Sequence, residues 1–147
     1  MLKLRMRHQM SQSIKLYNQL ANHKLFNKTI NFNLTRIKLV LKKLNHPEKK
    51  LKNVINFLGS SGKFTTLNSI KSFIEANNQT ATAYISPSLK DIKERFWMGE
   101  RYLTHQEIKQ SIKLIEKIKV PLTIFEVLTV VYIMNASKQN VDYHLIE

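Results

Sequence analysis

The sequence predicts an α/β fold in which a P-loop-type parallel sheet is flanked by helices. The main observation is the order of patterns in residues 53–85, where a β-rich run, a glycine turn, a helical stripe and a second β-rich run follow one another. That order is typical of a βαβ unit, whose strands form a parallel pair joined by a right-handed crossover. Composition agrees, because 147 residues with 43% hydrophobic and 23% charged residues suit one globular domain or a piece of one.

Residues 1–32 form a basic leader of uncertain order. Residues 1–47 hold ten Lys or Arg and no acidic residue, whereas residues 48–147 hold fourteen basic and ten acidic residues. A mitochondrial-type leader looks similar, and an over-long start assignment with Met10 as the true first residue fits as well. The domain proper is therefore expected to span residues 33–147.

The first helix is expected to start at Asn33, whose side chain suits an N-cap, and to end at His46-Pro47. Its apolar stripe consists of Leu34, Ile37, Leu41 and Leu44. Residues 53–58 then predict a strand that enters a tight turn at Gly59.

A second helix follows the turn and runs out at Asn77-Asn78. Its apolar stripe consists of Leu67, Ile70, Phe73 and Ile74. Residues 82–85 predict the second strand, which ends at Ser86-Pro87. In the polar stretch beyond, Phe96 and Trp97 are expected to pack, with Glu94 and Arg95 as a surface ion pair.

Thr104 and Glu107 have the spacing of a capping box at the start of a third helix. Its buried stripe is expected to comprise Ile108, Ile112, Ile115 and Ile118. Pro121 separates this helix from one over residues 123–136, which is apolar on most faces and should be largely buried.

Within residues 123–136, the side chains of Phe125, Leu128 and Tyr132 are expected in the core. Glu126 is expected to cap the helix or to be partly exposed, and burial of its carboxylate would demand a partner. Residues 141–147 predict a last strand. Three parallel strands give a narrow sheet with exposed edges, so either the sheet is completed elsewhere or the chain is a fragment.

Composition and spacing exclude several classes of site. The absence of Cys excludes a disulfide scaffold, a thiolate zinc site and a Cys nucleophile. No apolar run approaches the ~18 residues of a membrane-spanning helix, so we expect a cytoplasmic protein with no membrane partner. The five His show no metal-ligand spacing. Nucleic acid is not expected as a partner, because the Lys residues behind the net charge of +14 are scattered.

The strongest candidate for chemistry is the loop Gly59, Ser60, Ser61, Gly62, Lys63, Phe64, Thr65. Two glycines let backbone N–H groups converge on an anion, and the following helix adds its positive end. Lys63 supplies a charge for the β- and γ-phosphates, and the hydroxyl of Thr65 or Thr66 suits Mg²⁺. The standard P-loop pattern is not matched, since Phe57 stands at its first glycine and Phe64 follows the lysine. A plain helix-entry turn explains the loop as well.

Further landmarks occur in order beyond this loop. A helix ends at Asn45-His46-Pro47, and the strand and glycine loop follow it. Ile85-Ser86-Pro87-Ser88-Leu89 comes next, then Lys93-Glu94-Arg95-Phe96, then Phe125-Glu126-Val127-Leu128-Thr129, and finally Ile146-Glu147 at a strand end. With these landmarks, residues 34–147 resemble the amino-terminal part of the folylpolyglutamate synthase and dihydrofolate synthase family, of the Mur ligase superfamily.

The family's own motifs differ from this sequence at three positions. Family members carry Gly where this chain has Phe64, Asn where it has Ser61, and His where it has Ser88. The segment 125–129 is identical to the family's Phe-Glu-Val-Leu-Thr. The fold that the resemblance implies is an incomplete Mur-ligase ATPase domain, of which residues 33–147 would form the amino-terminal portion.

The function that the resemblance implies is an ATP-dependent ligase that adds L-glutamate to dihydropteroate or folate through an acyl phosphate. Carried over by position, residues 59–65 bind the triphosphate and Lys63 acts in catalysis. Thr65, Ser86 and Glu147 contact Mg²⁺, while Ser86, Pro87 and Leu89 line the pterin site. The family's second domain, which closes over ATP and binds glutamate, is expected to be needed for activity.

Two other functions stay open. One is a stand-alone or degenerate nucleotide-binding module without ligase activity, suggested by the short chain and the imperfect loop. The other is a basic nucleic-acid-binding protein, suggested by the net charge. Ser86-Pro87 also has a purely structural interpretation, as a turn that ends a strand.

Overall fold

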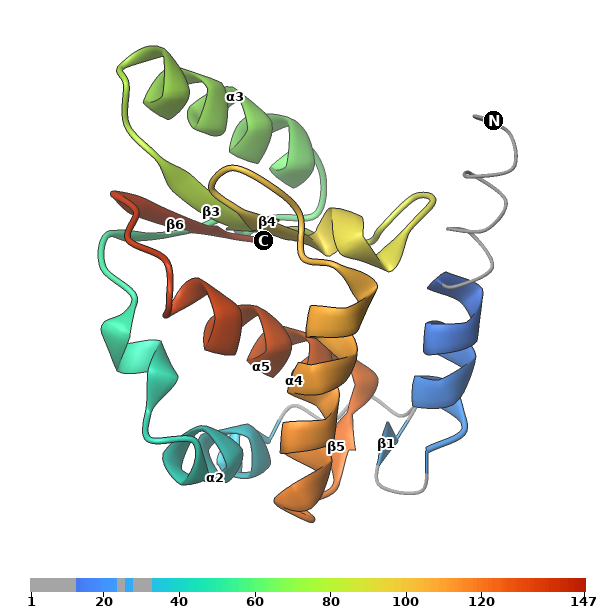
Figure 1. Cartoon of the computed structure of the whole chain (residues 1–147). Coiled ribbons are helices and arrows are strands. Elements are labelled where there is room, and N and C mark those ends of the chain that lie inside the picture. Colours follow the sequence, from blue (N-terminus) through green and yellow to red (C-terminus); the bar gives the residue numbers. More distant parts are fainter. Residues whose placement is uncertain (1–12, 24–25, 28–32) are drawn as a thin grey trace.

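The computed structural model describes residues 13–23, 26–27 and 33–147 (Figure 1). A helix spans residues 13–21. The elements that follow are β1 (Phe26–Asn27), α2 (Thr35–Lys43), η1 (Pro47–Lys50), β2 (Val54–Asn56), α3 (Lys63–Ala76), β3 (Ala81–Tyr84), η2 (Ile92–Arg95), β4 (Phe96–Met98), α4 (His105–Lys117), β5 (Leu122–Thr123), α5 (Ile124–Ala136) and β6 (Tyr143–Ile146). The predicted α/β fold is confirmed.

The main sheet has four strands in the order β2-β6-β3-β4. β6 pairs in parallel with both β2 and β3, and β4 pairs antiparallel with β3. The predicted strands exist, but β2 and β3 are not neighbours, because the last strand of the chain inserts between them. β4 was missed, since Phe96 and Trp97 carry the strand but were expected only to pack. Sequence periodicity does not report which strands pair.

Helices cover both faces of the sheet (Figure 1). α3 lies on one face, over a cluster made of Phe57, Leu67, Ile74, Ala81, Ala83 and Leu145. α5 lies on the other face, in a larger cluster that also includes residues of α4 and α2. All four residues of β3 are buried, as expected for a strand that is covered on both faces.

Two aromatic residues expected in the core lie at the surface. Phe73 of α3 is 69% exposed, because the helix packs through Leu67 and Ile74, and Phe73 projects from its flank. Phe125, in the first turn of α5, is 56% exposed. The two other predicted core residues of α5, Leu128 and Tyr132, are buried as expected.

Capping boxes begin both α4 and α5. In α4 the Thr104 hydroxyl accepts from Glu107 N–H, and Glu107 in return accepts from Thr104 N–H, which confirms the predicted box. Arg101 also donates to Glu107 and lowers the pKa of that carboxyl to about 2. The box of α5 pairs Thr123 with Glu126 in the same way.

Glu126 is buried and has the partner that burial demands. Its Oε2 lies 3.1 Å from Nη2 of Arg36, in the first turn of α2. The cap of α2 lies one residue later than expected, at Leu34, and the helix begins at Thr35. The Asn33 carboxamide oxygen accepts from the Thr35 N–H instead, so it closes the turn before the helix.

The described residues before 33 contribute to the same core. Leu16 and Leu20 of the helix over 13–21 are 2% exposed, and Phe26 is 5% exposed. β1 pairs in parallel with β5 in a separate two-stranded sheet. The boundary at residue 33 stays a prediction, and the segment's remaining residues lie outside the described part.

A buried polar chain links β6, β3 and α5. Nδ1 of His144 lies 2.7 Å from the Thr82 hydroxyl, which is 2.8 Å from the Tyr132 hydroxyl. His144 is 3% exposed, and burial lowers its pKa below the ordinary value of 6.5.

Acid is therefore expected to destabilise the protein through His144. Below pH 6.5 the unfolded chain binds a proton at this imidazole while the folded chain does not, so the free energy of unfolding falls until the pH passes the lowered pKa. Urea unfolding between pH 8 and pH 5 measures the loss, and His144→Asn should show a smaller one. Equal losses in the two proteins would contradict the assignment.

Candidate functional site

The loop between β2 and α3 lies where the three parallel strands β2, β6 and β3 end. Phe57 N–H donates to the carbonyl of Ile146 over 2.8 Å, and Glu147 N–H donates to that of Tyr84 over 3.0 Å. The pairing of the strands thus continues into the loop and fixes the position of Glu147. Crevices at the carboxyl ends of parallel strands are the usual ligand sites of open α/β sheets.

The loop leaves the start of α3 open to an anion. Gly62 precedes the helix with a φ of 77°, and Gly59 has a φ of 147°, both in the region that favours glycine. No side chain caps this helix, and its first turn contains no acidic residue. The N–H groups of that turn, which have no acceptor within the helix, therefore face outward with the positive end of the helix dipole.

Three of the predicted site residues come together beside this loop. Nζ of Lys63 lies 3.7 Å from Oε1 of Glu147, and the Ser86 N–H donates to Oε2 of Glu147 over 3.4 Å. The Glu147 side chain is only 5% exposed. Residues from the ends of β3 and β6 and from the start of α3 therefore surround one carboxylate.

The other predicted residues of the loop are exposed at the surface. Thr65 is exposed, and within the described residues no hydrogen bond joins its hydroxyl to Ser86 or Glu147. The alternative hydroxyl, that of Thr66, donates to the Gly62 carbonyl. Ser60 and Ser61 are exposed as well. The predicted metal set is thus only partly brought together in this structure.

Arg95 and Tyr17 were missed by the sequence as residues of this region. Arg95 is 9% exposed, and it donates from Nη1 to the Ser86 hydroxyl and from Nε to the Tyr17 hydroxyl. Arg95 was expected in a surface pair with Glu94, and this expectation is wrong. Glu94 accepts instead from the backbone N–H groups of Leu89 and Lys90.

An apolar pocket of about 670 Å³ adjoins the loop. Ser86, Pro87 and Leu89, the predicted substrate residues, line it together with Phe64. Phe64 is 49% exposed, so its ring forms part of a wall and is not packed beneath α3. The structure thereby resolves where this unusual loop residue lies.

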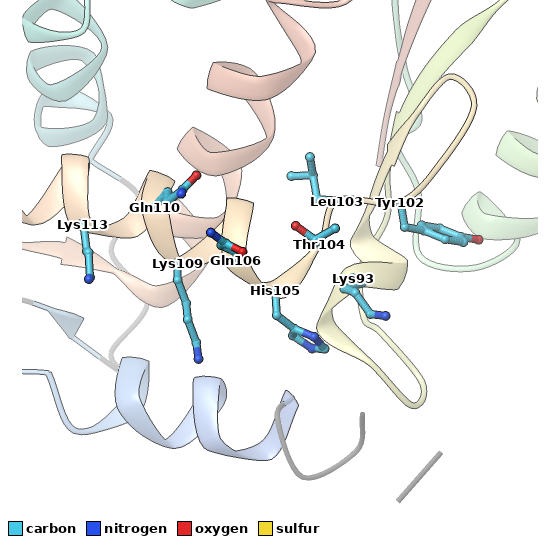
Figure 2. Close-up of a pocket in the computed structure, with 9 residues that line it drawn as sticks. All are labelled: Lys93, Tyr102, Leu103, Thr104, His105, Gln106, Lys109, Gln110 and Lys113. Atoms are coloured by element: carbon cyan, nitrogen blue, oxygen red, sulfur yellow. The ribbon is translucent and has the colours of Figure 1, made fainter. Parts of the chain in front are cut away.

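A second pocket, of about 660 Å³, lies along α4 and is basic (Figure 2). Figure 2 shows His105, Lys109 and Lys113 leaving α4 on the same side. Among the described residues, none of those predicted for the site lines this pocket. Burial lowers the pKa of His105 despite the neighbouring Asp91.

Two kinds of feature are absent from the described residues. These residues contain no group of three or more His, Asp or Glu that could hold a metal ion. They also contain no helix with the length and apolar character needed to cross a membrane.

Comparison with known proteins gives a match only in structure. No family model and no curated protein matches the sequence. FolC of E. coli, solved with DHPP and ADP, is similar with a TM-score of 0.81 and 27% identity over 91% of this chain and 32% of that one. A bifunctional folylpolyglutamate synthase/dihydrofolate synthase from Yersinia pestis, complexed with AMPPNP and Mn ion, has a TM-score of 0.79 and 24% identity, covering 92% and 33%.

A third solved structure, the folylpolyglutamate synthase of Mycobacterium tuberculosis complexed with ADP, has a TM-score of 0.78 and 19% identity over 95% of this chain and 32% of that one. At such identities the Yersinia and Mycobacterium structures support a shared fold alone. The chain spans about a third of the length of each of these structures. The resemblance that the ordered motifs indicate is thereby confirmed, and over nearly its whole length the chain has the fold of part of a folylpolyglutamate synthase/dihydrofolate synthase.

Proposed function

We propose that the chain supplies the nucleotide loop and part of the acceptor site of an ATP-dependent ligase that joins L-glutamate to dihydropteroate or folate. The observation that carries the proposal is the convergence of Lys63, Ser86 and Glu147 at the open start of α3. An E. coli relative was solved with DHPP and ADP, and another relative with AMPPNP, Mn and L-glutamate. Residues 33–147 would form the amino-terminal portion of the ATP-binding domain.

The reaction suits these residues. A carboxylate oxygen of the pterin-linked acceptor attacks the γ-phosphorus of ATP, and ADP leaves with the electrons of the broken P–O bond. The neutral glutamate amine then attacks the acyl carbon, phosphate leaves as the amide forms, and the nitrogen loses one proton to water. Residues 59–62 and the first turn of α3 would bind the phosphates, and Lys63 would offset the charge that develops on the transferred group.

The donor set at the site fits Mg²⁺ in part. Glu147 offers a carboxylate and Ser86 a hydroxyl, and hard oxygen donors of this kind are the ligands that Mg²⁺ prefers, with waters completing the shell. Thr65 is the third candidate ligand. When bound, Mg²⁺ would neutralise charge on the β- and γ-phosphates. Lys63 would then be released from Glu147 to face the phosphates.

The acceptor would lie in the apolar pocket lined by Ser86, Pro87, Leu89 and Phe64. The aromatic ring of Phe64 offers a flat face to a planar heterocycle. Because Ser86 belongs both to this pocket and to the Lys63 cluster, an acceptor seated there would bring its carboxylate towards the phosphates.

Replacing Lys63 by alanine is expected to weaken Mg·ATP binding about ten- to a hundredfold, since hydrogen bonds to charged groups contribute about 1.5–3 kcal/mol. Isothermal titration of the 147-residue chain measures the change. Lys138→Ala, which removes an exposed lysine beyond α5, is the matched control and should bind as the parent does. Equal affinity of the Lys63→Ala and Lys138→Ala proteins would exclude a role for the loop.

The second candidate function, a nucleotide-binding module without ligase activity, is favoured by the bulky Phe64 in the loop. Glutamate-dependent ADP release separates the two candidates when it is assayed with the chain alone and with a carboxyl-terminal domain of a relative added in trans. The ligase proposal predicts release only with the added domain and only with Lys63 present. Mg·ATP binding without release under either condition favours the module.

A further inference from the structure

Tyr17 and Arg95 connect the amino-terminal helix to the candidate site. Nε of Arg95 lies 3.1 Å from the Tyr17 hydroxyl, and its Nη1 lies 3.2 Å from the Ser86 hydroxyl. The Tyr17 hydroxyl in turn lies 2.8 Å from that of Ser88. Arg95 therefore joins Tyr17 to Ser86, and Tyr17 itself contacts Ser88, so the helix over residues 13–21 reaches both ends of the segment 86–88.

We infer that Arg95 and Tyr17 are positioning residues, which hold the Ser86 hydroxyl and the 86–90 segment in the orientation that a metal-bound nucleotide requires. The inference rests on the proposed function of Ser86. It adds the helix over residues 13–21 to the site, although the sequence pattern of that helix indicates no role.

The direction of the two Arg95 hydrogen bonds follows from the donors available. A guanidinium has only donors, so both Tyr17 and Ser86 accept from Arg95. The Ser86 hydroxyl therefore keeps its own proton and one lone pair, which leaves it able to contact a cation or a phosphate oxygen. The Tyr17 hydroxyl likewise keeps a proton and a lone pair, either of which can serve in its contact with Ser88.

Further hydrogen bonds hold the segment beyond Ser88. Glu94 accepts from the N–H groups of Leu89 and Lys90 over 2.7 and 3.1 Å. The Ser13 hydroxyl oxygen accepts from the Ile92 N–H over 2.9 Å, again from the amino-terminal helix. The helix therefore holds this segment at Ser88 and Ile92, and through Arg95 it reaches Ser86.

Arg95 is buried without a paired carboxylate. It is 9% exposed, and within the described residues no Asp or Glu forms an ion pair with it. Retaining a cation in such a position is costly unless hydrogen bonds satisfy it. Lysine could not replace it, because a single ammonium lacks the fixed fork that reaches Tyr17 and Ser86 together.

The test compares Tyr17→Phe and Arg95→Lys with Tyr143→Phe, which removes the hydroxyl of a half-buried tyrosine in β6. ATP affinity is measured by titration calorimetry on the 147-residue chain, once with Mg²⁺ and once with EDTA. Amide hydrogen exchange of Leu89 and Lys90 is followed without ligand. Circular dichroism and urea midpoints establish that each variant is folded.

We expect Tyr17→Phe to lower the affinity for Mg·ATP about fivefold and to speed exchange at Leu89 and Lys90 about fivefold, since one hydrogen bond contributes roughly 1 kcal/mol. Arg95→Lys should have larger effects. Affinity for ATP in EDTA should change less than twofold, because metal-free binding depends on the loop and Lys63. Tyr143→Phe should match the parent in all three measurements.

Two results would overturn the inference. One is parent-like exchange and parent-like Mg·ATP affinity in both variants. The other is an equal loss of affinity with and without Mg²⁺, which indicates general damage to the site. If the parent binds no ATP in either condition, the proposed function fails. The exchange measurement then decides alone, and only faster exchange in the variants supports a positioning role. If Arg95→Lys does not fold, Tyr17→Phe carries the test.

Discussion

Replacing Leu145 by alanine is expected to lower the free energy of unfolding by about 3–5 kcal/mol. Leu145 is fully buried in the middle of β6, the strand that lies between β2 and β3. It belongs to the cluster under α3, with Leu67 and Ile74 of that helix. Removing its branched end loses the transfer free energy and leaves a cavity that a sheet paired on both sides cannot close.

The consequence reaches the candidate site, because the same cluster fixes α3 on the sheet. Urea unfolding of Leu145→Ala measures the loss, and Leu58→Ala is the matched control, since Leu58 is 92% exposed. The control is expected to change stability by no more than about 0.5 kcal/mol. A difference of less than about 1 kcal/mol between the two variants would contradict this account of the core.

The family resemblance grouped Lys63, Ser86 and Glu147, and the structure places these three residues together. Each follows a strand, or the turn after a strand, and parallel strands end at one edge of a sheet. Runs of β-favouring residues bounded by turn residues located those strands. The insertion of β6 between β2 and β3 could not be predicted, because local patterns report burial and leave the choice of pairing partner open.

The contacts of Arg95 and Tyr17 could not be predicted either. They join residues 78 positions apart, and the motif Lys93-Glu94-Arg95-Phe96 gives no sign of a contact with Tyr17. The sequence placed Arg95 in a pair with its neighbour Glu94, which is the default for adjacent opposite charges at a surface. Burial of Arg95 depends on the approach of the amino-terminal helix, and this is a property of the tertiary structure.

Phe125 illustrates a third kind of failure. Its place in an apolar helix indicates burial, yet it is 56% exposed, with its ring centroid 6.4 Å from that of Tyr84. Its neighbours in the first turn of α5, Glu126 and Val127, are buried, so Phe125 lies on the one side of that turn that is not covered. A helix that is apolar on most faces gives no periodicity from which the exposed side could be identified.

The second large effect on stability is expected at the capping box of α5. The boxes of α4 and α5 have the same chemistry but differ in burial. Thr104 and Glu107 cap α4 at the surface, whereas Glu126, beside Thr123, is buried and also binds Arg36. Glu107→Ala should cost about 1 kcal/mol of unfolding free energy, the usual value of a lost cap. Glu126→Ala should cost about 2–4 kcal/mol, since it also leaves the largely buried Arg36 without its carboxylate.

Urea denaturation of both variants measures the comparison, and a double-mutant cycle with Arg36→Ala assigns the excess. If the larger cost of Glu126→Ala arises because the Arg36 guanidinium loses its carboxylate, Arg36→Ala should cost about 1–2 kcal/mol less in the Glu126→Ala background than in the parent. Additive effects would mean that Arg36 and Glu126 do not stabilise each other. An equal cost for Glu107→Ala and Glu126→Ala would mean that the carboxylate of α5 contributes only its cap, and that α2 is held to α5 by apolar contacts alone.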